Sequence, residues 1–260
     1  MATYLDRILD AHRKVAADDH RSVDQLREQA EGLPAARGFT RALADATGLG
    51  VISEVKRRSP SNGDLFADLD PAVLATSYQA GGATCLSVLT DVDWFGGSPE
   101  DLAAARAAVT IPVLRKDFTV SEPDVCDARL MGADAVLLIA AALDDVELKA
   151  FHQLATEVGL DALVEIHDEA ELERAMAVGA TLVGVNQRDL VTFQVDTERA
   201  VRMAPLMPEG VVRVAESGVR GIEDATHLAE AGYHAVLVGE SLVTSGDPQA
   251  AVAGLRAIRA

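Results

Sequence analysis

The sequence predicts an α/β fold, a (β/α)8 TIM barrel with an N-terminal helical extension. Eight short apolar runs recur along the chain at intervals that fit a strand, a helix and two loops, and eight βα units is the number that closes a barrel. Residues 1 to about 47 precede the first run and carry apolar side chains at helical spacing, so we expect them to pack on the barrel within one domain, 1–260. The runs are 51–52, 84–89, 111–114, 135–139, 162–164, 182–185, 211–214 and 235–238.

The ends of the intervening helices are marked in the sequence. Asp70-Pro71, Ser98-Pro99 and Asp247-Pro248 each place a capping oxygen before a proline at the first helical position, where the missing N–H costs nothing. A doubly wound open sheet also repeats βα units, but it carries a glycine fingerprint after its first strand, where this chain has Glu-Val-Lys-Arg-Arg at 54–58. Glycines expected to end helices with left-handed caps are Gly81, Gly82, Gly132, Gly159, Gly179 and Gly232.

Composition and charge exclude several classes of protein. The 260 residues include 41 acidic and 23 basic side chains, a formal charge of -18, whereas a nucleic-acid binder needs a basic surface. The longest strongly apolar stretch, 135–143, is far shorter than the roughly 20 residues that cross a bilayer. The first residues lack the apolar core of a secretory signal, and Cys85 and Cys126 form no zinc or disulfide pattern. We therefore expect a cytoplasmic protein.

Polar side chains stand at the ends of five predicted strands. In a (β/α)8 barrel, the reacting groups lie at the carboxyl ends of the strands and in the loops just after them. One such residue alone is more often a solvated loop charge, but a set that converges on one mouth indicates a catalytic pocket. The set is Glu54, Lys56, Lys116, Glu165, Asn186, Arg188, Glu216 and Ser217.

The scarcity of lysine adds to this prediction. Only four of the 23 basic residues are lysine, and two of them, Lys56 and Lys116, stand at strand ends. Arginine does not readily release its proton near neutral pH, whereas burial and neighbouring charges can tune an ammonium to do so. We expect at least one of the two lysines to donate a proton. Arg115 should point the other way on its strand and be structural or exposed.

Small residues follow the seventh and eighth runs, where barrels often bind phosphate. Residues 215–218, Ala-Glu-Ser-Gly, and 238–241, Val-Gly-Glu-Ser, would let backbone N–H groups approach an anion. In an acidic protein the anion also needs local positive charge, which Lys56, Lys116 and Arg188 could supply.

Aromatic residues follow the second and third runs. Trp94, Phe95 and Phe118 could belong to the core, or they could form a flat apolar wall for an aromatic substrate. The six histidines show no metal-ligand spacing, so no metal site is expected.

Five segments of the chain resemble the signature of the indole-3-glycerol phosphate synthase family, barrel enzymes of tryptophan biosynthesis. The resemblance runs in order from about residue 5 to the end. Arg58, Asn62 and Gln187 depart from the usual residues, which affects loop details only. The segments are 51–61 (VISEVKRRSPS), 114–118 (LRKDF), 162–167 (ALVEIH), 184–190 (GVNQRDL) and 215–219 (AESGV).

The resemblance implies a carbon–carbon lyase that converts 1-(2-carboxyphenylamino)-1-deoxyribulose 5-phosphate to indole-3-glycerol phosphate by ring closure, decarboxylation and dehydration. By the family's pattern Lys116 is the general acid, Glu165 stabilises iminium character and helps proton transfer, and Glu54 lies near the departing hydroxyl. The other implied catalytic residues are Lys56, Asn186 and Ser217; the implied substrate-binding residues are Ser59, Arg188, Phe95, Phe118, Leu137 and Leu190; the implied phosphate-binding residues are Lys56, Ser217, Gly218, Gly239 and Glu240.

The residue chemistry agrees with this implication. Ring closure through a carbonyl needs an acid on the oxygen, and loss of hydroxide needs a second proton, which a lysine and two carboxylates can supply. The iminium formed on closure can accept the electrons released with carbon dioxide, so no cofactor or metal is expected. The expected partner is a small, anionic, phosphorylated aromatic substrate, bound by a monomer without nucleic acid or membrane.

Two alternatives remain open at the level of sequence. A phosphoribosylanthranilate isomerase, another phosphate-binding barrel, is expected to use a cysteine on the first strand, where this chain has Glu54 and Lys56. A non-catalytic barrel would lose the acid–base set and keep the glycines, whereas here both are present.

Overall fold

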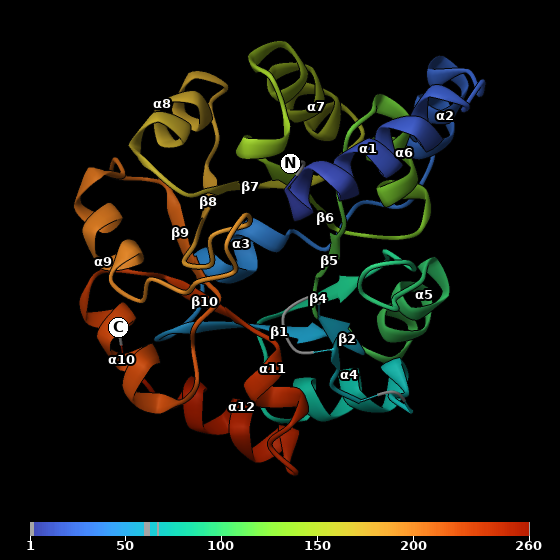
Figure 1. The fold of residues 1–260 in the computed structure, drawn as a ribbon. Helices are drawn as coiled ribbons and strands as arrows, with labels where there is room; N and C mark the ends of the chain where they lie inside the picture. Colours follow the sequence, from blue (N-terminus) through green and yellow to red (C-terminus); the bar gives the residue numbers. More distant parts are fainter. Residues whose placement is uncertain (1–2, 60–62, 67, 260) are drawn as a thin grey trace.

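The computed structural model describes residues 3–59, 63–66 and 68–259. Parallel strands close into an eight-stranded barrel with helices around it, which confirms the predicted fold (Figure 1). Each strand pairs with its neighbour along the chain, and the last strand pairs with the first. The barrel strands are β1 (Gly50–Val55), β4 (Cys85–Leu89), β5 (Val113–Lys116), β6 (Ala135–Ile139), β7 (Asp161–Ile166), β8 (Leu182–Asn186), β9 (Val212–Glu216) and β10 (Ala235–Val238); β2 (Arg58–Ser59) and β3 (Gly63–Asp64) form a hairpin after β1.

The predicted helix boundaries agree with the structure. Asp70, Ser98 and Asp247 each accept a hydrogen bond from a backbone N–H in the first turn of the helix that follows. The barrel helices are α4 (Pro71–Ala80), α5 (Pro99–Ala108), α6 (Glu122–Leu130), α7 (Asp145–Glu157), α8 (Glu169–Ala177), α9 (Arg199–Met203), α10 (Ile222–Glu230), α11 (Glu240–Val243) and α12 (Pro248–Arg256), with short 3-10 turns η1 (Ala140–Ala142) and η2 (Ala204–Leu206). The N-terminal extension forms α1 (Tyr4–Ala17), α2 (Val23–Glu31) and α3 (Phe39–Ala44).

Several strands run further than the apolar runs that predicted them. Lys116, Glu165 and Glu216 are strand residues, although the sequence placed them in the loops after the strands. The ladder between parallel strands is made by backbone groups, so it continues where the side chains become polar. Register places Asn186 opposite Glu216 and Ile139 opposite Glu165, so these polar side chains share one end of the barrel.

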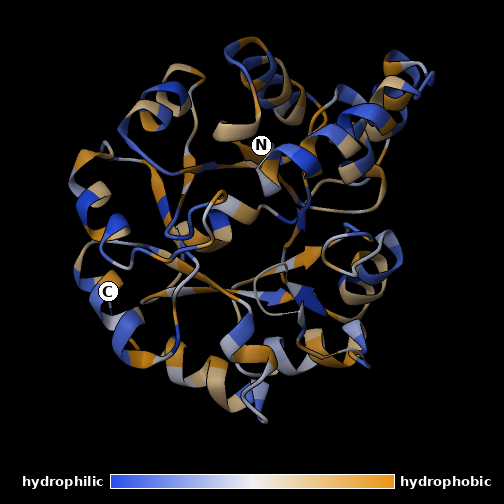
Figure 2. Cartoon of the chain, viewed as in Figure 1, coloured by the Kyte–Doolittle hydropathy of each residue, from blue (hydrophilic) through white to orange (hydrophobic). Residues whose placement is uncertain are grey.

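The hydrophobic core has two parts. One lies between the barrel and the surrounding helices, and the other fills the barrel interior, where Leu114, Leu137 and Leu163 are almost completely buried. Phe39 and Leu43 of α3 join the inner part. Figure 2 shows apolar residues along the strands and many polar residues on the outer helices. Among the described residues, no helix is long and apolar enough to span a membrane.

Candidate active site

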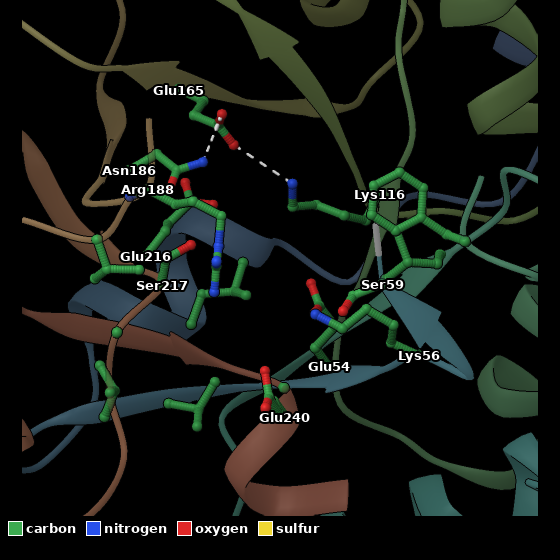
Figure 3. Close-up of a pocket in the computed structure, with 18 of the residues that line it drawn as sticks. Glu54, Lys56, Ser59, Lys116, Glu165, Asn186, Arg188, Glu216, Ser217 and Glu240 are labelled. Atoms are coloured by element: carbon green, nitrogen blue, oxygen red, sulfur yellow. Dashed lines mark hydrogen bonds and ion pairs between the residues drawn. The ribbon is translucent and has the colours of Figure 1, made fainter. Parts of the chain in front are cut away.

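A cavity of about 620 Å3 opens at the carboxyl ends of the barrel strands (Figure 3). The strand ends and the loops after them supply its walls, as expected for this fold. The structure brings every site residue predicted from the sequence to this one cavity. These residues are Glu54, Lys56, Ser59, Phe95, Lys116, Phe118, Leu137, Glu165, Asn186, Arg188, Leu190, Ser217, Gly218, Gly239 and Glu240.

An ammonium, a carboxylate and an amide are in contact at the centre of the cavity. Lys116 Nζ lies 3.4 Å from Glu165 Oε2, and Asn186 Nδ2 donates to Glu165 Oε1 at 3.0 Å (Figure 3). Glu165 is 1% exposed, so these partners supply most of the solvation of its carboxylate. The contacts hold the Glu165 carboxylate in one orientation at the end of β7.

A second buried carboxyl, Glu216 at the end of β9, lies against Glu165. Burial and the adjacent Glu165 charge raise the pKa of Glu216 well above its usual range. Burial acts in the same direction on Glu165, but Lys116 and His167 outweigh it and lower the pKa of Glu165. Two carboxyls in contact do not readily ionise together. The raised pKa favours the protonated form of Glu216, which can donate a hydrogen bond to the Glu165 carboxylate.

Lys116 is held as an ammonium. Burial alone would lower the pKa of Lys116, but the nearby Glu165, Glu216 and Glu54 carboxyls outweigh burial and raise the pKa. Lys116 therefore carries a proton at neutral pH and releases it only to a strongly basic atom, such as the oxygen of a developing alkoxide.

A second ammonium–carboxylate pair lies at the end of β1. Lys56 Nζ is 2.5 Å from Glu54 Oε1, and Glu54 is 5% exposed. The Glu54 side chain is also packed closely against the backbone of Gly239, where a Cβ would collide with Glu54 Oε1. Glu54 is thus fixed at the wall of the cavity beside the Lys56 ammonium.

The loops after β9 and β10 form the side of the cavity predicted to bind phosphate. Ser217 and Gly218 both have left-handed backbone conformations, with φ of 65° and 76°. This conformation is unusual for a serine, and backbone strain of this kind is often found at functional sites. Gln187 Nε2 donates to the Ser217 carbonyl at 2.8 Å, which stabilises the turn.

The aromatic residues are divided between the cavity and its surroundings. Phe95 and Phe118 line the cavity with their ring centroids 6.4 Å apart. Trp94 instead packs edge-on against Tyr4 of α1, with centroids 5.1 Å apart. Two of the three aromatic residues considered from the sequence therefore form a wall, and the third contacts the N-terminal extension.

Sequence reasoning assigned no role to several residues of the site. The sequence predicts Glu216 at the mouth without a function, and its contact with Glu165 depends on strand register, which residue spacing does not specify. His167 lies behind Glu165, with Nε2 3.7 Å from Glu165 Oε1 and Nδ1 3.1 Å from Glu171. Arg115 points away from the cavity as predicted; it is buried and pairs with Asp117 at 3.0 Å.

The two departures from the family pattern that the structure describes, Arg58 and Gln187, lie outside the barrel strands. The Arg58 side chain donates to the carbonyls of Val92 and Asp93, which ties the hairpin after β1 to the loop after β4. Asn62 lies outside the described residues. Gln187 supports the Ser217 turn described above.

Comparison with known proteins agrees with this geometry. The family model for indole-3-glycerol phosphate synthase matches residues 5–255. The chain belongs to this family. An indole-3-glycerol phosphate synthase from Mycolicibacterium vanbaalenii is 51% identical over 256 residues, covering 98% of this chain and 94% of the relative. One from Nocardioides sp. is 58% identical over 207 residues, covering 80% of each chain.

A solved structure shares the fold alone. The thiamine phosphate pyrophosphorylase from Pyrococcus furiosus superposes with a TM-score of 0.61 at 16% sequence identity, covering 80% of this chain and 94% of that one. Family membership confirms the resemblance predicted from the sequence, and with it a carbon–carbon lyase of tryptophan biosynthesis. It favours this prediction over the isomerase and the non-catalytic barrel.

Proposed function

We propose that the chain converts 1-(2-carboxyphenylamino)-1-deoxyribulose 5-phosphate to indole-3-glycerol phosphate, carbon dioxide and water. The observation that carries the proposal is the contact between Lys116 and Glu165, an ammonium held by a buried carboxylate. It lies in a cavity that has a phenylalanine wall and, in the loops after β9 and β10, small residues suited to phosphate. Family membership supports the same reaction.

Ring closure uses the Lys116 proton. The ring carbon that bears the carboxylate attacks the ribulose carbonyl carbon, a carbon–carbon bond forms, and the carbonyl oxygen takes the proton from Lys116 Nζ. The aromatic ring becomes cationic with iminium character at the nitrogen. Glu165, ionised and fixed by Asn186, stabilises that positive charge as it develops.

Decarboxylation then restores the aromatic ring. The bond between the ring carbon and the carboxylate breaks, carbon dioxide leaves, and the bonding electrons neutralise the iminium. The apolar wall of Phe95 and Phe118 favours this step. A carboxylate is poorly solvated against such a wall, whereas neutral carbon dioxide needs little solvation, so the charged reactant is destabilised relative to the product.

Dehydration completes the indole. The hydroxyl formed in the first step leaves as water after taking a proton, and the adjacent carbon loses a proton. Glu54 lies near the departing hydroxyl, the Lys56 ammonium that it holds supplies the proton, and Glu165 accepts the second proton. Lys56, beside Glu54, balances the charge of the substrate's carboxylate or phosphate.

Binding uses the remaining residues of the cavity. Ser217, Gly218, Gly239 and Glu240 bind the phosphate, the last through its backbone, while Arg188 adds positive charge. Ser59, Leu137 and Leu190 complete the surface around the substrate. The proposal includes a single-domain monomer that acts in the cytoplasm, without nucleic acid, membrane, metal or organic cofactor.

The test is a turnover assay with the purified chain and the carboxyphenylamino substrate, with EDTA present and no cofactor added. We expect one carbon dioxide released for each indole product, measured by chromatography because Trp94 adds to fluorescence. The Lys116→Met variant is the negative control, because it lacks the proposed acid. No product at high enzyme concentration would overturn the proposal.

A further inference from the structure

Helix α1 of the extension contacts the barrel loops that carry the aromatic wall. Tyr4 packs edge-on against Trp94, in the loop after β4, and against Phe193, in the loop after β8, with centroid distances of 5.1 Å and 5.0 Å. Further along the helix, Arg13 pairs with Glu147 of α7 at 2.7 Å. In Figure 1 this helix lies beside α6 and α7. The extension therefore contacts loops from distant parts of the chain.

His12 of α1 lies between two carboxylates from neighbouring strands. His12 Nε2 is 2.9 Å from Asp91 Oδ2, after β4, and 3.9 Å from Asp117 Oδ1, after β5. The imidazole ring also packs on Phe118, with centroids 5.5 Å apart. Both aspartates are almost completely buried, whereas His12 is partly exposed.

Each of these carboxylates fixes the backbone of an aromatic residue in the cavity wall. Asp91 Oδ1 accepts hydrogen bonds from the backbone N–H groups of Trp94 and Phe95, at 2.6 Å and 3.1 Å. Asp117 Oδ1 accepts from the Phe118 N–H at 2.9 Å. A single imidazole thus contacts both groups that hold Phe95 and Phe118 in place.

The charges around His12 favour its protonated form. The carboxylates that face it are Asp91, Asp117 and, further away, Asp124 of α6; the cation on the far side is Arg115, which pairs with Asp117. Burial would lower the pKa of His12, but the hydrogen bond to Asp91 and the three carboxylates outweigh burial and raise it. The raised pKa means that the contact is complete at acid to neutral pH and is lost as the pH rises through the folded-state value.

We propose that His12 is a positioning residue, whose imidazolium bridges Asp91 and Asp117 and so sets the aromatic wall that receives the substrate's aryl ring. This inference rests on the proposed function for the identity of the ligand. Loss of the His12 charge loosens the two loops, so substrate binding weakens while the acid–base groups of the central cluster keep their places.

The first test needs no activity. Trp94 is the single tryptophan of the chain, and its backbone N–H donates to Asp91, so its emission reports on this contact. We expect the wild-type emission to titrate with a midpoint above 6.5, the ordinary pKa of histidine. The titration should disappear in His12→Gln and persist in Arg13→Gln, a matched variant that removes the neighbouring anchor of α1.

Two results of this test would overturn the inference. One is a titration that persists unchanged in His12→Gln. The other is a wild-type titration abolished by EDTA, because His12, Asp91 and Asp117 could then be ligands of a metal ion rather than an ion-paired cluster.

The second test separates binding from chemistry. For His12→Gln we expect KM to rise about tenfold near neutral pH while kcat stays nearly unchanged. This is the result expected when a variant loses an interaction that stabilises the bound substrate and the transition state equally. In the wild type, KM should rise as the pH passes through the midpoint of the Trp94 emission titration. An unchanged KM in an active His12→Gln enzyme contradicts the inference. Absence of turnover in the wild type contradicts the proposed function instead, and in that case the Trp94 titration still tests the role of His12.

Discussion

Gly184 leaves the space that the Glu216 carboxyl occupies. A Cβ at Gly184 would overlap Glu216 Oε1 and lie 3.2 Å from Leu163 Cδ1. Gly184 is paired in register with Glu165 on β7, and β8 lies between β7 and β9. The contact between the two carboxyls therefore depends on a strand position without a side chain.

Replacement of Gly184 by alanine should reduce turnover with little change in secondary structure. The new methyl group displaces Glu216 and, through it, Glu165; misplacement of a catalytic group by about 1 Å can lower the rate roughly 10²-fold. Gly221→Ala is the control, because its Cβ would meet no atom within 4 Å. Steady-state kinetics with circular dichroism check this, and equal kcat in both variants would contradict it.

Lys116→Met should abolish most turnover because it removes the acid and keeps most of the length of the side chain. We expect kcat to fall by about 10² to 10⁴, the typical contribution of a well-placed acid or base. Lys116→Arg keeps the positive charge beside Glu165 but cannot readily donate a proton. If Lys116→Arg has near wild-type kcat, only the charge is needed, and Lys116 is not the general acid.

Much of the fold could be predicted because barrel strands and their helices leave local signals. The capped starts at Asp70, Ser98 and Asp247 and the apolar runs located the βα units. Strand ends were less accurate: β9 extends to Glu216, beyond the predicted 211–214. The apolar side chains end where the site begins, whereas the backbone hydrogen bonds between the strands continue past that point.

The site could be predicted as a set of residues but not as a set of contacts. Lys116 and Glu165 were assigned roles because they stand at strand ends within family motifs. The raised pKa of Glu216 and the contact of His12 both depend on distant residues. Glu165 is 51 positions from Glu216, and Asp91 is further still from His12 in the sequence. Such contacts follow from register and helix docking, which residue spacing does not specify.

Asp70→Ala should reduce the stability of the fold without reducing turnover. The Asp70 carboxylate accepts from the backbone N–H groups of Ala72 and Val73, at 2.9 Å and 3.1 Å, and so caps α4. Loss of such a cap lowers the free energy of unfolding by about 1 kcal/mol. Urea denaturation measures this, and Asp70→Asn should retain most of the stability. Equal losses in the two variants would show that charge, not capping geometry, is responsible.

Glu216→Gln should change how the stability of the protein depends on pH. A carboxyl with a raised folded-state pKa binds its proton more tightly in the folded than in the unfolded chain, so stability falls as pH rises from the ordinary carboxyl range toward the folded value. Glutamine resembles the protonated form in shape and does not titrate. The free energy of unfolding of Glu216→Gln, relative to that of wild type, should therefore increase between about pH 5 and about pH 8.

The neighbouring Glu165 does not reverse this expectation. Its pKa is lowered, so the stability it contributes is present above the ordinary carboxyl range and is lost mainly below about pH 5. Urea denaturation at both pH values, with Glu223→Gln as an exposed control, isolates the Glu216 contribution. If Glu216→Gln and Glu223→Gln show the same pH dependence, Glu216 is ionised in the folded protein, and the proposed hydrogen bond from Glu216 to Glu165 is wrong.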